Sequence, residues 1–244
     1  MDPSSSYPRR EPVAFPTTHW SVVVSAGHGR EESLEQLCRE YWPPVYAFLR
    51  QRNPHHDAKD LAQGFFEFIL SREFLAQVEC EGGRFRSFLL AALKHYVSDV
   101  YDRSRAQKRG GGRWVVRLDE VDGEGQRLLD PPDPGLSPAE AFDREWARTV
   151  FANAAGRLRA EEARRGHGEL LEVLEPVLFG DSDPGTYQRI GVRFGMSEGA
   201  VKQRARRLRE RLRYLIREGV ERTVRDPKDV EDELRHLTCL LARG

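Results

Sequence analysis

A short segment near the C-terminal end of the chain concentrates positive charge. Between residues 202 and 213 it holds seven lysine or arginine side chains and one carboxylate, that of Glu210. A guanidinium group can donate two parallel hydrogen bonds to guanine, a glutamine amide can pair with adenine, and any of these cations can bind a phosphate. These residue types therefore suit a DNA duplex. The candidate contact residues are Lys202, Gln203, Arg204, Arg206 and Arg207.

Two predicted helices would position these side chains. Residues 186–194 form the first, Gly195 permits the unusual backbone angles of a turn, and Ser197 caps the second helix. Gly191 is small enough to let the second helix cross the first closely. Apolar residues at helical spacing predict the buried side of the second helix, namely Val201, Ala205, Leu208 and Leu212. An isolated basic run is as often a solvated helix, but these spacings together favour a DNA-binding helix-turn-helix.

A second cationic segment lies between residues 84 and 117, with nine basic and two acidic side chains. A long helix is predicted to start near Arg84, with apolar residues recurring along one side. Its other side carries Arg86, Lys94, Arg103 and Arg105. A cationic helix with aromatic neighbours can hold unpaired DNA bases by backbone attraction and stacking, although most of the aromatic rings here are expected to pack inward.

The segment DAKDLAQGFFEFIL combines an acidic side with an aromatic side. On a helix the first side presents Asp57, Asp60, Gln63 and Glu67, and the second packs into a core. Such a helix could dock against a basic partner. By periodicity alone, a solvated charged side is the commoner interpretation.

Charge alternates along the chain although the total is zero, with 39 basic and 39 acidic side chains. Residues 31–81 carry a net charge of −5 and residues 84–117 one of +7. Residues 118–146 then carry −7 and residues 186–217 carry +8. Two cationic blocks separated by an anionic one indicate two separate surfaces for a polyanion.

Several classes of protein are not expected. The chain has no phosphate-binding glycine loop and no nucleophile elbow, so we predict no enzyme, no catalytic residue and no cofactor. Its three cysteines are far apart, and His55 and His56 cannot share a helix side, so we expect neither disulfides nor a metal site. A signal peptide or membrane span is not expected either, which favours a cytoplasmic protein without a membrane partner.

The predicted fold class is all-α, with two small helical domains joined by an acidic linker rich in proline and glycine. We predict a partly disordered N-terminal extension (1–30), a first helical domain (31–109), the linker (110–136), a helix-turn-helix domain (137–217) and a C-terminal helical extension (218–244). Ser33 should cap the first helix, which Pro43 and Pro44 should break or kink. Ser137 and Glu140 mark another helix start, and the last helix should pack on the second domain or bind a partner.

In the order in which these segments occur, the chain resembles the sigma factors of bacterial RNA polymerase, specifically the two-domain extracytoplasmic-function group. The resemblance rests on DAKDLAQGFFEFIL, on GGRFRSFLLAALKHYVSDVYDRSRAQKR and on TYQRIGVRFGMSEGAVKQRARRLRERLRYL. It covers about residues 33–109, matching the family's second region, and about 165–217, matching its fourth.

The resemblance implies a role for each segment. Asp57, Asp60 and Gln63 would bind the clamp coiled coil of the polymerase. The minus-thirty-five promoter element would be read by Lys202, Gln203, Arg204, Arg206 and Arg207. The melted minus-ten element would be contacted by Arg84, Arg86, Lys94, Asp99, Arg103 and Arg105. This sequence departs from the family pattern at Gly64, where a glutamate is common, and in the loop between Gln77 and Gly83. Core polymerase and promoter DNA, double-stranded and melted, are therefore the expected partners, with a regulatory protein or kinase as a possible third.

Two alternatives remain open from the sequence. The chain could be a helix-turn-helix regulator that binds DNA without joining polymerase and uses residues 31–109 to dimerise or to sense a signal. It could also be an interaction module that keeps a sigma-like shape. A stable complex with core polymerase would exclude the first alternative. A loss of activity on removal of Arg206 and Arg207 would exclude the second.

Overall fold

The structure is a computed structural model that describes residues 31–52, 58–71, 84–108, 135–180 and 183–242. All regular structure within these ranges is helical, apart from one isolated antiparallel bridge between Arg84 and Val224. The all-α prediction is therefore confirmed. The linker, the N-terminal extension, Asp57 and the loop from Gln77 to Gly83 lie outside the described residues, wholly or nearly so.

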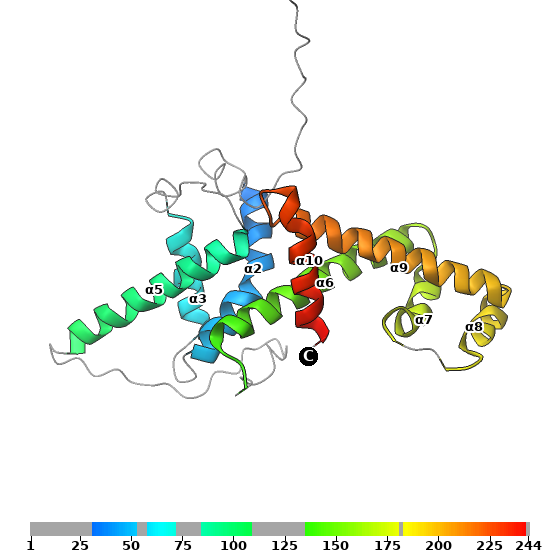
Figure 1. Ribbon diagram of the computed structural model, residues 1–244, viewed down its shortest axis with the longest axis horizontal. Helices are drawn as coiled ribbons and strands as arrows, with labels where there is room; N and C mark the ends of the chain where they lie inside the picture. The colour runs from blue at the N-terminus through cyan, green and yellow to red at the C-terminus, as the bar shows by residue number, and fades with distance from the viewer. Residues whose placement is uncertain (1–30, 53–57, 72–83, 109–134, 181–182, 243–244) are drawn as a thin grey trace, which may run out of the picture.

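A first core forms around α2 (Glu31–Arg52), α3 (Ala58–Ile69) and α5 (Phe85–Lys108), which lie together in Figure 1. The apolar side predicted for α3 is buried and comprises Ala58, Ala62, Phe65, Phe66 and Ile69. Aromatic side chains pack edge to face inside this core, as Tyr41 does on Phe85 with a distance of 5.2 Å between ring centroids.

A second core forms between α7 (Gly168–Phe179), α8 (Thr186–Phe194), α9 (Glu198–Glu221) and the C-terminal half of α6 (Pro138–Arg164). The start of α6 is the predicted capping box. Ser137 Oγ accepts from the Glu140 N–H at 3.3 Å, and the Glu140 carboxylate accepts from the Ser137 N–H at 2.8 Å. Both reciprocal bonds satisfy amide groups that a helix start otherwise leaves unpaired.

Helices α6 and α9 each run through both cores. The first half of α6 buries Phe142, Trp146 and Ala147 in the first core, while Leu158 of the same helix lies in the second. Likewise α9 contributes Val201 to the second core and Val220 to the first. Figure 1 shows these two helices extending side by side from the first group of helices to the second. The two cores are thus connected by continuous helices.

Two details of α2 differ from the prediction, namely the position of Ser33 and the absence of a break at the two prolines. Ser33 lies inside the first turn rather than at the cap, and the helix continues through Pro43 and Pro44 without a break. Each proline forfeits an N–H bond to the preceding turn, but Tyr41, Val45 and Phe48 on either side are almost fully buried. Burial of these large side chains outweighs the lost backbone bonds, because tertiary packing commonly overrides local propensity.

The C-terminal segment packs on the first core as well as on α6 and α9. Its helical turn η2 (Pro227–Asp229) starts at Asp226, whose side chain accepts from the Lys228 N–H at 3.0 Å. Helix α10 (Val230–Ala242) follows and buries Val230, Glu233 and Leu237. The buried apolar side chains of the extension thus lie in the first core, together with those of the adjoining parts of α6 and α9.

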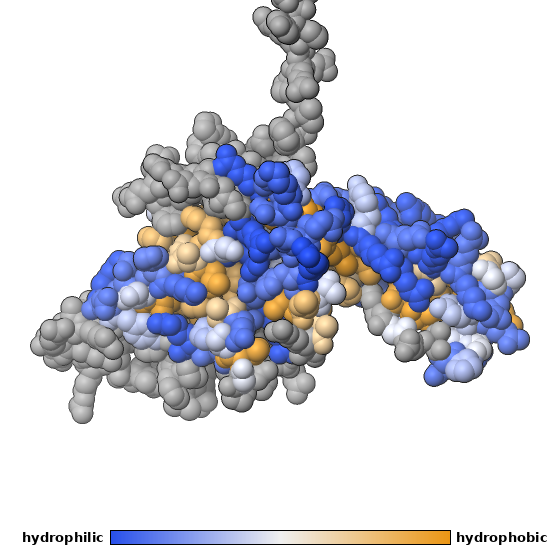
Figure 2. All heavy atoms as spheres, viewed as in Figure 1, coloured by the Kyte–Doolittle hydropathy of each residue, from blue (hydrophilic) through white to orange (hydrophobic). Residues whose placement is uncertain are grey.

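Among the described residues, no helix has the length and apolar character needed to cross a membrane. In Figure 2 hydrophilic side chains cover most of the visible side of α9. Cys38 and Cys239 are free thiols, and burial raises the pKa of the Cys38 thiol.

Candidate nucleic-acid interface

The turn between α8 and α9 is built from two glycines and a serine. Gly195 adopts a left-handed backbone with φ 64°, a conformation in which most side chains are strained. The Met196 N–H donates to the Gly191 carbonyl at 2.8 Å, which closes the turn. Ser197 then caps α9, where its Oγ accepts from the Ala200 N–H at 3.2 Å. All three positions act as the spacing predicted.

Replacing Gly191 with alanine should destabilise this turn. A Cβ atom at position 191 would lie 2.5 Å from the Met196 carbonyl oxygen and 3.6 Å from the Glu198 nitrogen. Because these are backbone atoms, the turn itself must move, and we expect a loss of about 1–3 kcal/mol in the free energy of unfolding. Chemical denaturation measures it, with Gly199→Ala as a control, since a Cβ at Gly199 meets nothing within 4 Å. Equal effects of the two substitutions would contradict the close packing of Gly191 against the Met196 backbone.

The two sides of α9 are sharply different. Val201, Ala205, Leu208 and Leu212 are buried, as predicted, in the second core. Lys202, Gln203, Arg206 and Arg207 are exposed. The apolar side thus fixes the helix against its neighbours and leaves four candidate contact residues facing outward.

Two of the outward cations pair with carboxylates on the same helix. Lys202 Nζ lies 2.6 Å from Glu198, whose hydrogen bond and charge raise the pKa of the lysine. Arg206 Nε donates to Glu210 at 2.9 Å. Both pairs are solvent-exposed and therefore weak, so a phosphate or base could displace the carboxylates at small cost.

Arg204 has a different environment from its neighbours. Its guanidinium group binds the carboxylate of Glu162, which is only 2% exposed, and its Nη2 lies 2.9 Å from His167 Nδ1. Arg165 also donates to Glu162, at 2.9 Å. This cluster ties α9 to the junction of α6 and α7, so Arg204 serves to position α9.

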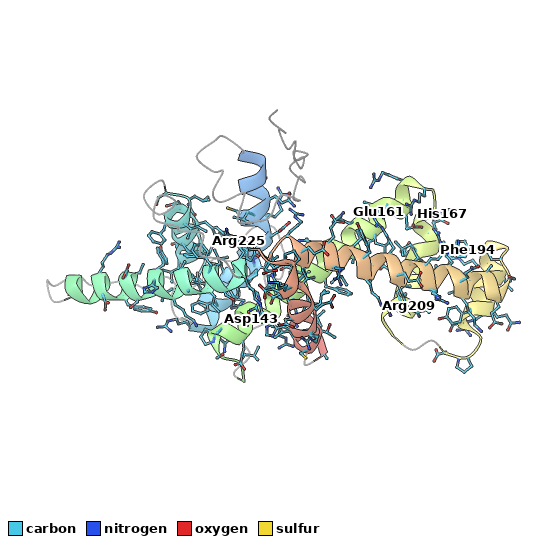
Figure 3. The ribbon with its side chains drawn as sticks, turned by 45° about the horizontal axis from the view of Figure 1, so that its top comes forward. Asp143, Glu161, His167, Phe194, Arg209 and Arg225 are labelled. Carbon is cyan, nitrogen blue, oxygen red and sulfur yellow. The ribbon has the colours of Figure 1, made fainter. Side chains whose placement is uncertain are left out.

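Two further arginines of the basic run are also tied to the second core. Arg209 donates to the Val177 carbonyl at 2.6 Å, and Arg211 donates to Glu161 at 2.7 and 2.8 Å. The hydrogen bonds from Arg211 lower the pKa of Glu161. Figure 3 shows Arg209, Glu161 and His167 on the elements around this core. Part of the positive charge in the sequence therefore serves packing.

Sequence reasoning missed Glu162 as a structural residue. Its position carries a signal that could have revealed it, because it follows buried Leu158 by four residues and Ala155 by seven. Residues at those spacings share one side of a helix. A carboxylate on an apolar side predicts a buried partner, which here is Arg204.

The predicted docking side of α3 is partly described. Asp60, Gln63 and Glu67 are exposed, and Gln63 Nε2 donates to Glu67 at 3.1 Å. Gly64, which departs from the family pattern, has a packing reason. A Cβ atom there would overlap the Tyr96 hydroxyl of α5, so the glycine lets this ring lie against α3. Burial and the charge of Glu67 raise the pKa of Tyr96.

The candidate residues of the second cationic segment differ in their exposure to solvent. Lys94 and Arg103 are exposed on α5, and Arg105 lies on the same helix. Arg84 is partly covered and pairs with Glu233 at 3.0 Å. Arg86 is only 6% exposed and lies beneath α6 and α10, so in this arrangement it cannot reach DNA.

The surroundings of Arg86 explain its burial. It donates to Glu233 of α10 and, at 2.6 Å, to Asp143 of α6, while its guanidinium carbon lies 5.1 Å from the centre of the Trp146 ring. Burial alone would lower the pKa of Arg86, but the hydrogen bonds and charges of both carboxylates outweigh that effect and raise it. Figure 3 shows Asp143 on α6, close to α5 and α10.

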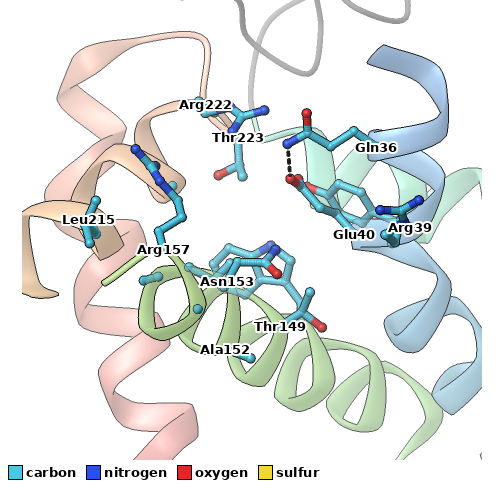
Figure 4. Close-up of a pocket in the computed structure, with 16 residues that line it drawn as sticks. Gln36, Arg39, Glu40, Thr149, Ala152, Asn153, Arg157, Leu215, Arg222 and Thr223 are labelled. Carbon is cyan, nitrogen blue, oxygen red and sulfur yellow. Dashed lines mark hydrogen bonds between the residues drawn. The ribbon is translucent and has the colours of Figure 1, made fainter. Parts of the chain in front are cut away.

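A cavity of about 400 Å³ lies between α2, α6 and α9 (Figure 4). Polar side chains that line it are already hydrogen bonded. Gln36 donates to Glu40 at 2.8 Å, and Arg157 donates to the neighbouring Glu218 at 2.9 Å. In the ranges that the structure covers, no three histidine, cysteine or acidic side chains form a group that could hold a metal ion.

Comparison with known proteins provides one informative match. The chain is 27% identical over 205 residues to the ECF RNA polymerase sigma factor ShbA of Streptomyces griseus, and the alignment covers 80% of this chain and 93% of the relative. No protein-family model matches the chain, and no solved structure matches it. Since the alignment spans most of both proteins, the chain is related to bacterial RNA polymerase sigma factors.

Proposed function

We propose that this chain is an extracytoplasmic-function type sigma factor, which binds core RNA polymerase in the cytoplasm and directs it to promoters. In this proposal α8 and α9 form a helix-turn-helix that reads the minus-thirty-five element, and α5 contacts the melted minus-ten element. The chain contributes binding and strand separation, and the polymerase performs the chemistry.

One observation supports DNA reading most directly, namely the arrangement of α9. Its apolar side is buried while Lys202, Gln203, Arg206 and Arg207 face solvent within the first three turns after its capped start. A recognition helix enters the major groove in this way, with residues near its N-terminal end at the base edges. Arginine suits guanine and glutamine suits adenine, while the remaining cations hold phosphates.

Polymerase binding rests on the relationship to sigma factors and on the exposed side of α3. Asp60 and Gln63 face solvent there, and Asp57 precedes them in the sequence. A row of exposed acidic and amide groups is complementary to a basic surface. The melted strand would bind along α5, where Lys94 and Arg103 are exposed.

Replacing Arg206 and Arg207 together with alanine should weaken promoter binding and reduce its dependence on salt. Each lost phosphate contact lowers the slope of log affinity against log salt concentration by about 1. We therefore expect the slope to fall by about 2, measured by fluorescence anisotropy on a promoter duplex with the polymerase holoenzyme. Arg235→Ala is the matched control, because Arg235 is exposed on α10. An unchanged slope would exclude α9 as the DNA-contacting helix.

Gel filtration with core polymerase tests the other half of the proposal. The chain should elute with the polymerase, and Asp60→Lys should abolish the complex, whereas Asp232→Lys on α10 should not. DNA binding by the chain without any complex would instead identify a regulator that acts apart from polymerase.

A further inference from the structure

The C-terminal strap, residues 223–242, lies across the start of α5. The Phe85 N–H donates to the Thr223 carbonyl at 2.9 Å, and Arg84 forms the antiparallel bridge with Val224. Helix α10 then packs Val230 and Leu237 into the first core. The strap is thus held by backbone hydrogen bonds at one end and by apolar contacts along its length.

A buried carboxylate of the strap binds both arginines at the start of α5. Glu233 is 0% exposed, accepts from Nε and Nη2 of Arg86, and pairs with Arg84 Nε at 3.0 Å. Asp143 accepts from the remaining terminal nitrogen of Arg86. The two positive charges are balanced by two negative ones within this protein.

Stability alone explains this cluster poorly. Well-packed apolar side chains of similar volume stabilise a fold as well as a buried ion-pair cluster does, because removing the charges from water is costly. A charged cluster differs from an apolar one in that another anion can replace its carboxylates. A phosphate presents the same paired acceptor oxygens to a guanidinium group as Glu233 does.

We propose that the C-terminal strap is an autoinhibitory element, in which Glu233 takes the place of nucleic-acid phosphate on Arg84 and Arg86. In the free protein the strap covers the start of α5, where Thr223 accepts from the Phe85 N–H, and it directly follows the end of α9, whose Val220 lies in the first core. When the chain joins core polymerase and promoter DNA, the strap leaves and the two arginines contact the DNA backbone. This inference rests on the proposed promoter-melting function of α5.

Hydrogen exchange on the unaltered full-length chain tests the release. We expect the amides of α10 and of Phe85 to exchange at least tenfold faster in the complex with core polymerase and promoter than in the free protein. A complex in which these amides keep their protection would overturn the strap proposal and leave the sigma-factor assignment intact. Failure to form any complex would contradict the sigma-factor assignment itself, and with it the strap.

A substitution tests the competition without polymerase. Glu233→Gln keeps the shape of the side chain and removes its charge, so the free protein should bind a single-stranded oligonucleotide about tenfold more tightly. The slope of log affinity against log salt concentration should steepen by about 1.4, because two more cations reach phosphates. Asp232→Asn, which makes the same charge change on the exposed side of α10, should have no such effect. Equal affinities of the Glu233 and Asp232 variants would overturn the proposal, and thermal unfolding confirms that both variants are folded.

Discussion

Arg86→Met should lower the free energy of unfolding by about 3–5 kcal/mol, the typical cost of removing one partner from a buried ion pair. Methionine has neither a charge nor an N–H group to offer Asp143 and Glu233, which both accept hydrogen bonds from Arg86. Glu233 is fully buried and would keep only Arg84 as a partner. Urea unfolding followed by circular dichroism measures the change.

A second variant distinguishes two causes of this loss, namely uncompensated charge on the carboxylates and lost packing of the Arg86 side chain. In the triple variant Arg86→Met, Asp143→Asn, Glu233→Gln, the carboxylates no longer carry uncompensated charge, so most of the stability should return. Arg148→Met serves as a control, because Arg148 is exposed on α6. A triple variant as unstable as the single one would show that packing on Trp146, and not charge, explains the effect.

Leu208→Ala should cost about 2–5 kcal/mol of unfolding free energy while its neighbour Arg207→Ala changes it by less than about 0.5 kcal/mol. Leu208 is 3% exposed in the second core, and Arg207 faces solvent. The effects on DNA binding should be reversed, since Arg207→Ala weakens binding by a chain that remains folded. Thermal unfolding and duplex binding of the two variants provide the comparison.

This pair of variants tests the orientation of α9 itself. If Arg207→Ala destabilised the protein as much as Leu208→Ala, the basic side of the helix would be part of the core. The helix could then not enter a major groove with that side, and the proposed promoter contacts would be wrong.

The sequence predicted those features of the fold that depend on neighbouring residues. The capping box of Ser137 and Glu140, the cap at Ser197 and the turn at Gly195 each need only a few adjacent residues. Apolar periodicity likewise predicted the buried side of α9, because helical geometry alone decides which residues share a side.

Features that depend on distant parts of the chain could not be predicted in this way. Arg86 binds carboxylates 57 and 147 residues away, so its own segment does not reveal them. Its spacing of seven residues from buried Leu93 was the available signal that it lies on a covered side. The helix through Pro43 and Pro44 also depends on the surrounding core, which outweighs a local rule.

Run-off transcription tests the central claim most directly. Core polymerase is combined with the chain and a library of genomic promoter fragments, and its products are compared with those of core polymerase alone. We predict discrete transcripts that appear only when the chain is present, and that disappear with Asp60→Lys or with Arg206→Ala and Arg207→Ala together. Identical products with and without the chain would contradict the assignment of this protein as a sigma factor.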